Sequence, residues 1–214
     1  MHRFHLILAL LLFSGSEYAS AHPHSWINLK SEFTFDKQGR LTKLTQHWAF
    51  DVYYSMMTSA DMMNEHGNKE KGLAFLSKTM AKSLKQYDYF SELKVNNTLV
   101  PLPSPTQSEL VMVLSEGQEI LKLSMQFEFL QPKQIEDKPI SFRVFDPTYY
   151  IDMRHYTASQ IILHTQNALE CSTTVALPDT PDELIDYANS LDKSQESTQG
   201  LGSSFAEQVV IHCI

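Results

Sequence analysis

The chain has 214 residues, of which 43% are hydrophobic, and its 25 acidic and 17 basic side chains give a formal charge of −8. This acidic balance argues against a nucleic-acid partner, because a phosphate backbone selects a basic surface. The hydrophobic content is sufficient for a packed core, which excludes a disordered chain.

Residues 1–21 have the pattern of a secretory signal peptide. An apolar run from Phe4 to Phe13 leads to Ala19-Ser20-Ala21, a small-x-small cleavage sequence. The run is too short to span a membrane, and no later segment approaches the roughly 20 apolar residues that a span needs. We therefore expect a periplasmic protein that does not span the membrane after signal cleavage, with residues 22–214 forming a single β-rich domain.

The next two segments predict a β-hairpin. Residues 24–36 and 41–51 alternate between apolar and polar side chains, and the Asp36-Lys37-Gln38-Gly39 sequence between them is typical of a tight turn. Seven apolar residues of these strands should face the core: Ile27, Leu29, Phe33, Phe35, Leu44, Trp48 and Phe50.

The apolar spacing then changes to that of helices over about residues 55–87. Apolar side chains recur there at intervals of three and four, which is the stripe of an amphipathic helix, and Gly67 and Asn68 should interrupt it. Methionine pairs in the first half are interpreted as core-filling side chains, with a soft-metal role as the less favoured alternative.

The remainder of the chain predicts short strands at hairpin-sized spacings. They are expected at residues 93–101, 109–115, 119–129, 140–146, 149–154, 159–164 and 169–176. A short helix should begin within residues 178–187, followed by a mobile loop at about 192–204 and a last strand at 205–214. The predicted fold is α+β, mostly antiparallel β and sandwich-like, with a helical insertion after the first hairpin.

The two cysteines, Cys171 and Cys213, both lie in the predicted mature chain. An even number of cysteines in an oxidising compartment predicts one disulfide, which would fix the C-terminal strand. Two buried thiols are the alternative interpretation.

The predicted mature N-terminus is a candidate metal site. His22 would carry both an α-amine and an imidazole, and His24 adds a second imidazole on the same face of an extended strand. Imidazole suits zinc, copper, nickel and iron. Because Pro23 has no N–H, chelation through deprotonated backbone amides is excluded and side chains must hold the ion. A solvent-exposed terminus that binds nothing is the alternative.

Two carboxylates are candidates to complete the site. The hairpin register places Asp51 nearly across from Trp26 on the face of His24, whereas His47 lies roughly 13 Å further along, so we prefer Asp51 to His47 as a ligand. Asp146, in the Asp-Pro-Thr-Tyr-Tyr sequence, is either an oxygen ligand, an acceptor that orients a histidine ring, or part of a plain turn with packed tyrosines.

No common motif for catalysis or for nucleotide binding occurs in the sequence, so we expect a protein that is not an enzyme. The histidines that stand alone receive no role: His66, His155, His164 and His212. The alternative from another class is an oxidative enzyme, in which the amino-terminal histidine chelates copper through its amine and ring.

Five features occur together in a fixed order. They are His22-Pro23-His24, Trp48-Ala49-Phe50-Asp51, Tyr87-Asp88-Tyr89-Phe90, Asp146-Pro147-Thr148-Tyr149-Tyr150 and the two late cysteines. With them, nearly the whole mature chain resembles the domain-of-unknown-function 1007 family. The resemblance implies an exported periplasmic component of an uncharacterised transport system, paired with a nickel/cobalt-type inner-membrane permease and in some cases implicated in zinc uptake.

That resemblance implies a function in metal traffic. By position, the matching polar residues are His22, His24, Asp51 and Asp146, which would hold zinc or nickel/cobalt for delivery to the partner permease. A metal-free docking scaffold for a membrane transporter is the alternative. The resemblance also implies an acidic, calcium-loop-like stretch in the helical insertion, which many relatives carry. Residues 64–70 lack alternating aspartates, so we expect no calcium binding here.

Overall fold

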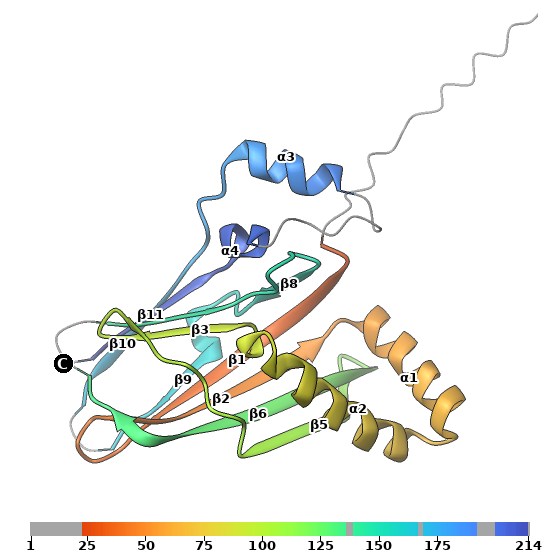
Figure 1. The fold of residues 1–214 in the computed structure, drawn as a ribbon, viewed down its shortest axis with the longest axis horizontal. Coiled ribbons are helices and arrows are strands. Elements are labelled where there is room, and N and C mark those ends of the chain that lie inside the picture. Colours follow the sequence, from red (N-terminus) through yellow and green to blue (C-terminus); the bar gives the residue numbers. More distant parts are fainter. Residues whose placement is uncertain (1–22, 136–138, 167–168, 192–199, 214) are drawn as a thin grey trace, which may run out of the picture.

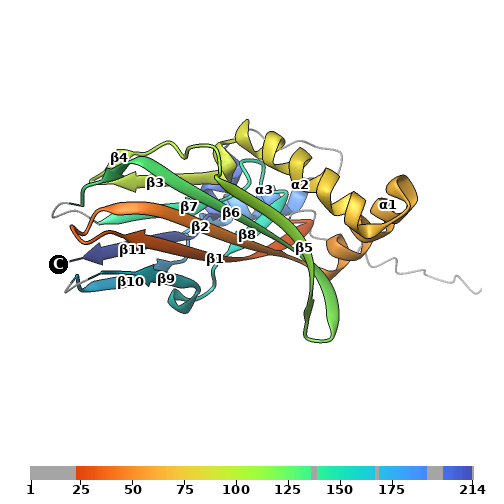
Figure 2. The same cartoon turned by 90° about the horizontal axis from the view of Figure 1, so that it is seen from below.

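Two β-sheets pack across one core in the computed structural model, and a pair of helices lies at the end of the sandwich opposite the C terminus (Figures 1 and 2). The structure describes residues 23–135, 139–166, 169–191 and 200–213. The helices are α1 (Val52–His66), α2 (Lys69–Lys85), α3 (Asp182–Ser190) and α4 (Leu201–Phe205), with short 3₁₀ turns η1 (Asp88–Phe90) and η2 (Ala158–Gln160).

The larger sheet contains β1 (Ser25–Phe35), β2 (Leu41–Phe50), β5 (Gln107–Ser115), β6 (Gln118–Lys133), β8 (Ile151–Arg154) and β9 (Ile161–His164). Its order is β5-β6-β2-β1-β8, and β9 pairs with a further part of β1. The smaller sheet contains β3 (Ser91–Val95), β4 (Thr98–Leu99), β7 (Ile140–Val144), β10 (Cys171–Ala176) and β11 (Gln208–Cys213). Its order is β10-β11-β7-β3-β4. The predicted α+β class, mostly antiparallel, is confirmed.

Two strands differ from the antiparallel pattern. β8 and β9 run parallel to β1, along successive parts of the same edge. The chain reaches them from β7, which belongs to the other sheet, so they enter by a crossover and not by a hairpin. A crossover is the connection that parallel pairing requires.

The core follows the alternation of the first hairpin. All seven of its apolar residues predicted to face inward are buried, and the register pairs Ile27 with Phe50 and Leu29 with Trp48. The Phe33 ring meets Phe142 of the opposite sheet edge to face, with centroids 5.5 Å apart. The hairpin therefore provides one wall of the shared core.

The helical insertion is interrupted where the sequence predicted. Gly67 ends α1 with φ of 73°, a left-handed conformation that favours glycine, and the Asn68 side chain accepts the backbone N–H of Lys71 to begin α2. The two helices meet closely at Gly72, where a Cβ atom would lie 2.5 Å from the Cβ of Met62. Only glycine allows this contact.

The C-terminal region differs from its prediction. The predicted mobile loop extended to residue 204, but α4 begins at Leu201; residues 192–199 lie outside the described part of the chain. α4 forms because Leu201 and Phe205 bury apolar surface against Tyr149 and α3 in a small second cluster. Consequently, the last strand begins at Gln208 rather than at Phe205.

The predicted disulfide is present between Cys171 and Cys213, which are paired residues of β10 and β11. It fixes the last strand of the smaller sheet. No helix in the described part of the chain is long and apolar enough to cross a membrane.

Replacing both cysteines by serine should lower the free energy of unfolding. The disulfide joins residues 42 apart in sequence, and a closed loop of this size corresponds to roughly 4 kcal/mol of unfolded-state entropy. Urea unfolding followed by circular dichroism measures the difference between the oxidised protein and the double variant. Equal midpoints would contradict the expectation.

Candidate functional site

The predicted site residues that the structure describes lie around the start of β1. The backbone N–H of His24 donates to the carbonyl oxygen of Tyr150 at 2.9 Å, and the centroids of the two rings are 4.7 Å apart. His22 lies outside the described residues. The chain therefore enters the fold at His24, fixed to the segment that contains Tyr150.

Asp51 lies where the hairpin register predicted, opposite Trp26. Its backbone N–H donates to the Trp26 carbonyl at 3.0 Å, and its Oδ2 accepts the Trp26 N–H at 3.1 Å. The same Oδ2 accepts the Ser25 hydroxyl at 2.6 Å, while Oδ1 accepts the Tyr54 N–H at 2.8 Å as the N-cap of α1. Both carboxylate oxygens are thus engaged in holding α1 to the start of β1.

Asp146 is the centre of a turn and is 6% exposed. Its Oδ1 accepts the backbone N–H and the hydroxyl of Thr148, both at 2.9 Å, and its Oδ2 accepts the backbone N–H of Ile151 at 3.1 Å. These bonds shape the turn that precedes β8. Because Ile151 pairs with Ser25 of β1, the two predicted carboxylates belong to one hydrogen-bonded corner.

The two tyrosines after this turn have different environments. Tyr149 is buried and stacks on Phe205, with ring centroids 3.9 Å apart. Burial, and then the charge of Asp152, raise the pKa of the Tyr149 phenol. Tyr150, which contacts His24, is 44% exposed. Tyr149 therefore has a packing role, whereas Tyr150 faces the entry of the chain.

A pocket of about 450 Å³ joins two sequence motifs that are far apart in the chain. It is lined by Tyr87, Phe90, Asp146, Pro147 and Thr148. The two segments that line the pocket are joined by a hydrogen bond, in which the backbone N–H of Phe145 donates to the carbonyl oxygen of Phe90 at 2.8 Å.

The segment before β3 has an unusual backbone conformation. Three consecutive residues, Asp88 to Phe90, have φ between 50° and 56°. Such values are uncommon outside glycine and store local strain.

His47 lies away from this corner, as expected, and belongs to a polar row on the outer face of the larger sheet. Its Nε2 lies 3.2 Å from Glu32, whose other oxygen is 2.8 Å from the Nε2 of His164. Its Nδ1 lies 2.8 Å from the Ser124 hydroxyl. Burial, and then the charge of Lys122, lower the pKa of His47, which favours the neutral ring.

The described residues do not form a complete metal centre. Within residues 23–135, 139–166, 169–191 and 200–213, no three His, Cys, Asp or Glu side chains are grouped so that they could hold an ion. His24, Asp51 and Asp146 share one corner, but both carboxylates are occupied by backbone and hydroxyl donors. Whether these residues bind a metal stays a prediction.

Comparison with known proteins identifies the family. The profile described as "Protein of unknown function (DUF1007)" matches residues 6–213. The chain belongs to the DUF1007 family. An uncharacterised protein from Haemophilus influenzae (strain ATCC 51907 / DSM 11121 / KW20 / Rd) is 27% identical over 220 residues, covering 100% of both chains. No solved structure matches the chain significantly.

This DUF1007 protein also contains a buried polar network that the sequence did not indicate. The Ser31 hydroxyl lies 2.9 Å from Nε2 of His155, and Glu207 accepts the His155 backbone N–H at 2.7 Å. All three residues are at most 3% exposed, so no substrate reaches the hydroxyl. The network joins the two sheets through the core. Ser31 and His155 are 124 residues apart, so no local motif could have revealed it.

Replacing Asp51 by alanine should destabilise this DUF1007 protein, because it removes the N-cap of α1 and the bonds to Ser25 and Trp26. Loss of a capping side chain costs about 1 to 2 kcal/mol. Asp51→Asn, which preserves a capping oxygen, should cost less. Asp61→Ala, at an exposed position of α1, is the control. Equal urea midpoints for Asp51→Ala and Asp61→Ala would contradict this role.

Glu32 should make the free energy of unfolding depend on pH in the acid range. Burial raises its pKa, but hydrogen bonds from His164 and Lys30, with the charges of Lys30 and His47, outweigh burial and lower the pKa from 4.5 to about 2. The contribution is therefore complete above pH 4.5 and is lost as the pH falls towards 2.

Acid titration of the unfolding free energy measures this effect. Between these pH values, the wild type should lose roughly 1 to 2 kcal/mol more than Glu32→Gln, after allowance for solvent screening. Glu109→Gln, at an exposed position of the same sheet, is the control and should titrate like the wild type. Parallel curves for the wild type and Glu32→Gln would exclude the effect.

Proposed function

We propose that this protein is a periplasmic accessory protein that binds a divalent metal ion, zinc or nickel/cobalt, and delivers it to a partner inner-membrane permease. The observation that carries the proposal is the position of His24. It is held against Tyr150 where the described chain begins, and His22 precedes it by two residues. This arrangement would present two imidazoles and an α-amine at one corner of the fold.

In this proposal the histidines are the ligands and the carboxylates position them. Asp51 and Asp146 already accept backbone N–H and hydroxyl groups with both oxygens, and metal coordination would compete with those bonds. Asp51 instead fixes Ser25, the residue next to His24, and Asp146 fixes the turn that leads to Tyr150. Outer residues of this kind orient metal ligands.

Three nitrogen donors would leave at least one coordination position open. Zinc with three protein ligands retains a position for water or for an incoming ligand. An open position suits an ion that is cargo, because a ligand of the permease can enter before the histidines leave. The proposed site is therefore one for transfer rather than for permanent structural binding.

The proposed location agrees with the structural features of the chain. Residues 1–21 have the pattern of a signal peptide, and the Cys171–Cys213 disulfide is compatible with an oxidising compartment such as the periplasm. The amine of His22 becomes available only after cleavage following Ala21, so export and metal binding would be coupled.

Metal titration of protein purified from the periplasm tests the proposal. We expect near-stoichiometric binding of zinc, nickel or cobalt, lost in His22→Ala/His24→Ala and retained in the control His66→Ala/His212→Ala. Asp51→Asn should retain the stoichiometry because its role is to position the ligands. Unchanged binding by His22→Ala/His24→Ala would overturn the ligand assignment. Absence of binding by the folded wild type would favour the metal-free docking scaffold.

A further inference from the structure

The pocket at the Asp146 turn combines two aromatic rings with one carboxylate. Tyr87 and Phe90 come from the segment before β3, whereas Asp146, Pro147 and Thr148 come from the segment before β8. The volume of about 450 Å³ lies within the range of small-molecule sites, roughly 300 to 1,000 Å³. Only one of the lining residues, Asp146, carries a charge.

The two rings are oriented by contacts with their own segment and with the core. The Phe90 N–H donates to the Tyr87 carbonyl at 2.9 Å, and the ring centroids are 5.9 Å apart at an interplanar angle of 52°. Phe90 also lies parallel to the buried Trp48, with ring centroids 6.1 Å apart. The tilt makes the two rings a corner instead of a stack. Aromatic faces carry partial negative charge and attract cations.

Asp146 brings to the pocket a buried charge that has no counterion in the described part of the chain. Three carboxylates are buried among the described residues: Asp146, Asp152 and Glu207. Asp152 pairs with Arg154 at 2.9 Å. Glu207 lies 3.7 Å from Nδ1 of His155. Asp146 has hydrogen-bond donors but forms no ion pair with any described residue, although a buried charge usually has a partner of opposite sign.

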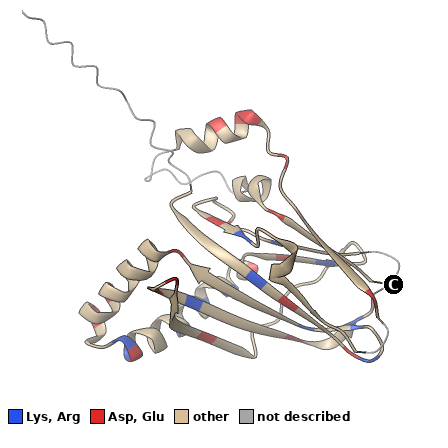
Figure 3. Ribbon diagram, turned by 180° about the vertical axis from the view of Figure 1, so that it is seen from behind, with Lys and Arg blue, Asp and Glu red and all other residues tan. Residues whose placement is uncertain are grey.

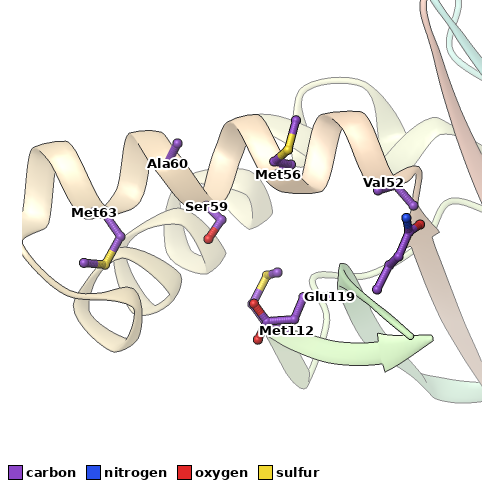
Figure 4. Close-up of a pocket in the computed structure, with 8 residues that line it drawn as sticks. Val52, Met56, Ser59, Ala60, Met63, Met112 and Glu119 are labelled. Atoms are coloured by element: carbon purple, nitrogen blue, oxygen red, sulfur yellow. The ribbon is translucent and has the colours of Figure 1, made fainter. Parts of the chain in front are cut away.

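The groove of about 480 Å³ beside α1 lacks an unbalanced charge of this kind (Figure 4). Its one carboxylate, Glu119, is bridged by Lys69 at 2.7 Å. Basic and acidic residues are likewise interspersed along the strands, with pairs such as Lys30 and Glu32 at 2.9 Å (Figure 3). The pocket at Asp146 therefore differs from the groove in having a charge that selects its occupant.

The hydrogen bonds of the turn select the kind of cation. The carboxylate of Asp146 already accepts the backbone N–H and hydroxyl of Thr148 and the backbone N–H of Ile151. The backbone carbonyls of Asp146 and Pro147 also accept N–H groups of the chain. A ligand N–H would compete with these donors, whereas a quaternary ammonium group has no N–H to satisfy. A metal ion would need several free donor atoms, which the aromatic rings do not supply.

We propose that this pocket binds a small quaternary ammonium compound, with its cationic head against Tyr87 and Phe90 and the charge of Asp146 beside it. Lys85 and Asp88, on either side of Tyr87, are exposed and outside the lining, so neither sets the charge of the pocket. The site is additional to the proposed metal function, because neither of the proposed histidine ligands lines it.

Isothermal titration calorimetry of the mature, oxidised protein with choline tests the proposal. Two analogues separate the contributions to binding. The neutral analogue with a tert-butyl group in place of trimethylammonium keeps the shape without the charge, and ethanolamine keeps the charge but has N–H groups in place of methyl groups. We expect saturable binding of choline and at least about tenfold weaker binding of each analogue.

Substitutions of Tyr87 test the aromatic contact. Tyr87→Leu keeps an apolar side chain but removes the ring, so it should weaken choline binding by about threefold to tenfold. Tyr87→Phe keeps the ring face and should retain the wild-type affinity. Tyr53→Leu, at another exposed tyrosine that does not line the pocket, is the matched control. Because Tyr87 is 57% exposed, these variants should retain the wild-type circular dichroism spectrum.

A free solute and a lipid headgroup can present the same ammonium chemistry, and vesicles distinguish these two sources. Choline binding without binding to phosphatidylcholine vesicles would support a free solute. Binding to phosphatidylcholine vesicles but not to phosphatidylglycerol vesicles, lost in Tyr87→Leu, would support the headgroup as the source of the same ligand chemistry.

Three results would overturn the proposal. The first is the absence of saturable binding of both choline and phosphatidylcholine vesicles by the folded wild type. The second is binding of the neutral analogue or of ethanolamine as tight as that of choline. The third is wild-type affinity for choline in folded Tyr87→Leu. Choline binding retained by His22→Ala/His24→Ala would show that the pocket acts independently of the proposed metal ligands.

Discussion

The carboxylate of Asp51 is the constraint on which the corner formed by the start of β1 and the start of α1 depends. One of its oxygens caps α1 through Tyr54, and the other holds Ser25 and Trp26 at the start of β1. The direction in which α1 leaves the sheet and the position at which the N-terminal segment enters are thereby fixed by the same side chain. Since His24 is adjacent to Ser25, the position of the proposed ligand depends on a residue that is itself a capping group.

The sequence predicted the features that depend on local periodicity. The first hairpin, its seven core residues and the break at Gly67 followed from alternation, helical spacing and turn chemistry. Features that depend on distant contacts were not predictable in this way: β8 and β9 pair parallel to β1, and the His155 network spans the core. The capping role of Asp51 was missed because the helix was expected to begin near residue 55, whereas it begins at Val52.

X-ray absorption spectroscopy of the zinc-loaded mature protein tests the central claim most directly, because it identifies the atoms bound to the ion. We expect nitrogen ligands with the outer-shell scattering of two imidazole rings, and the same spectrum from Asp51→Asn. A first shell of oxygen atoms without imidazole scattering would contradict the assignment of His22 and His24 as ligands and return the carboxylates to that role.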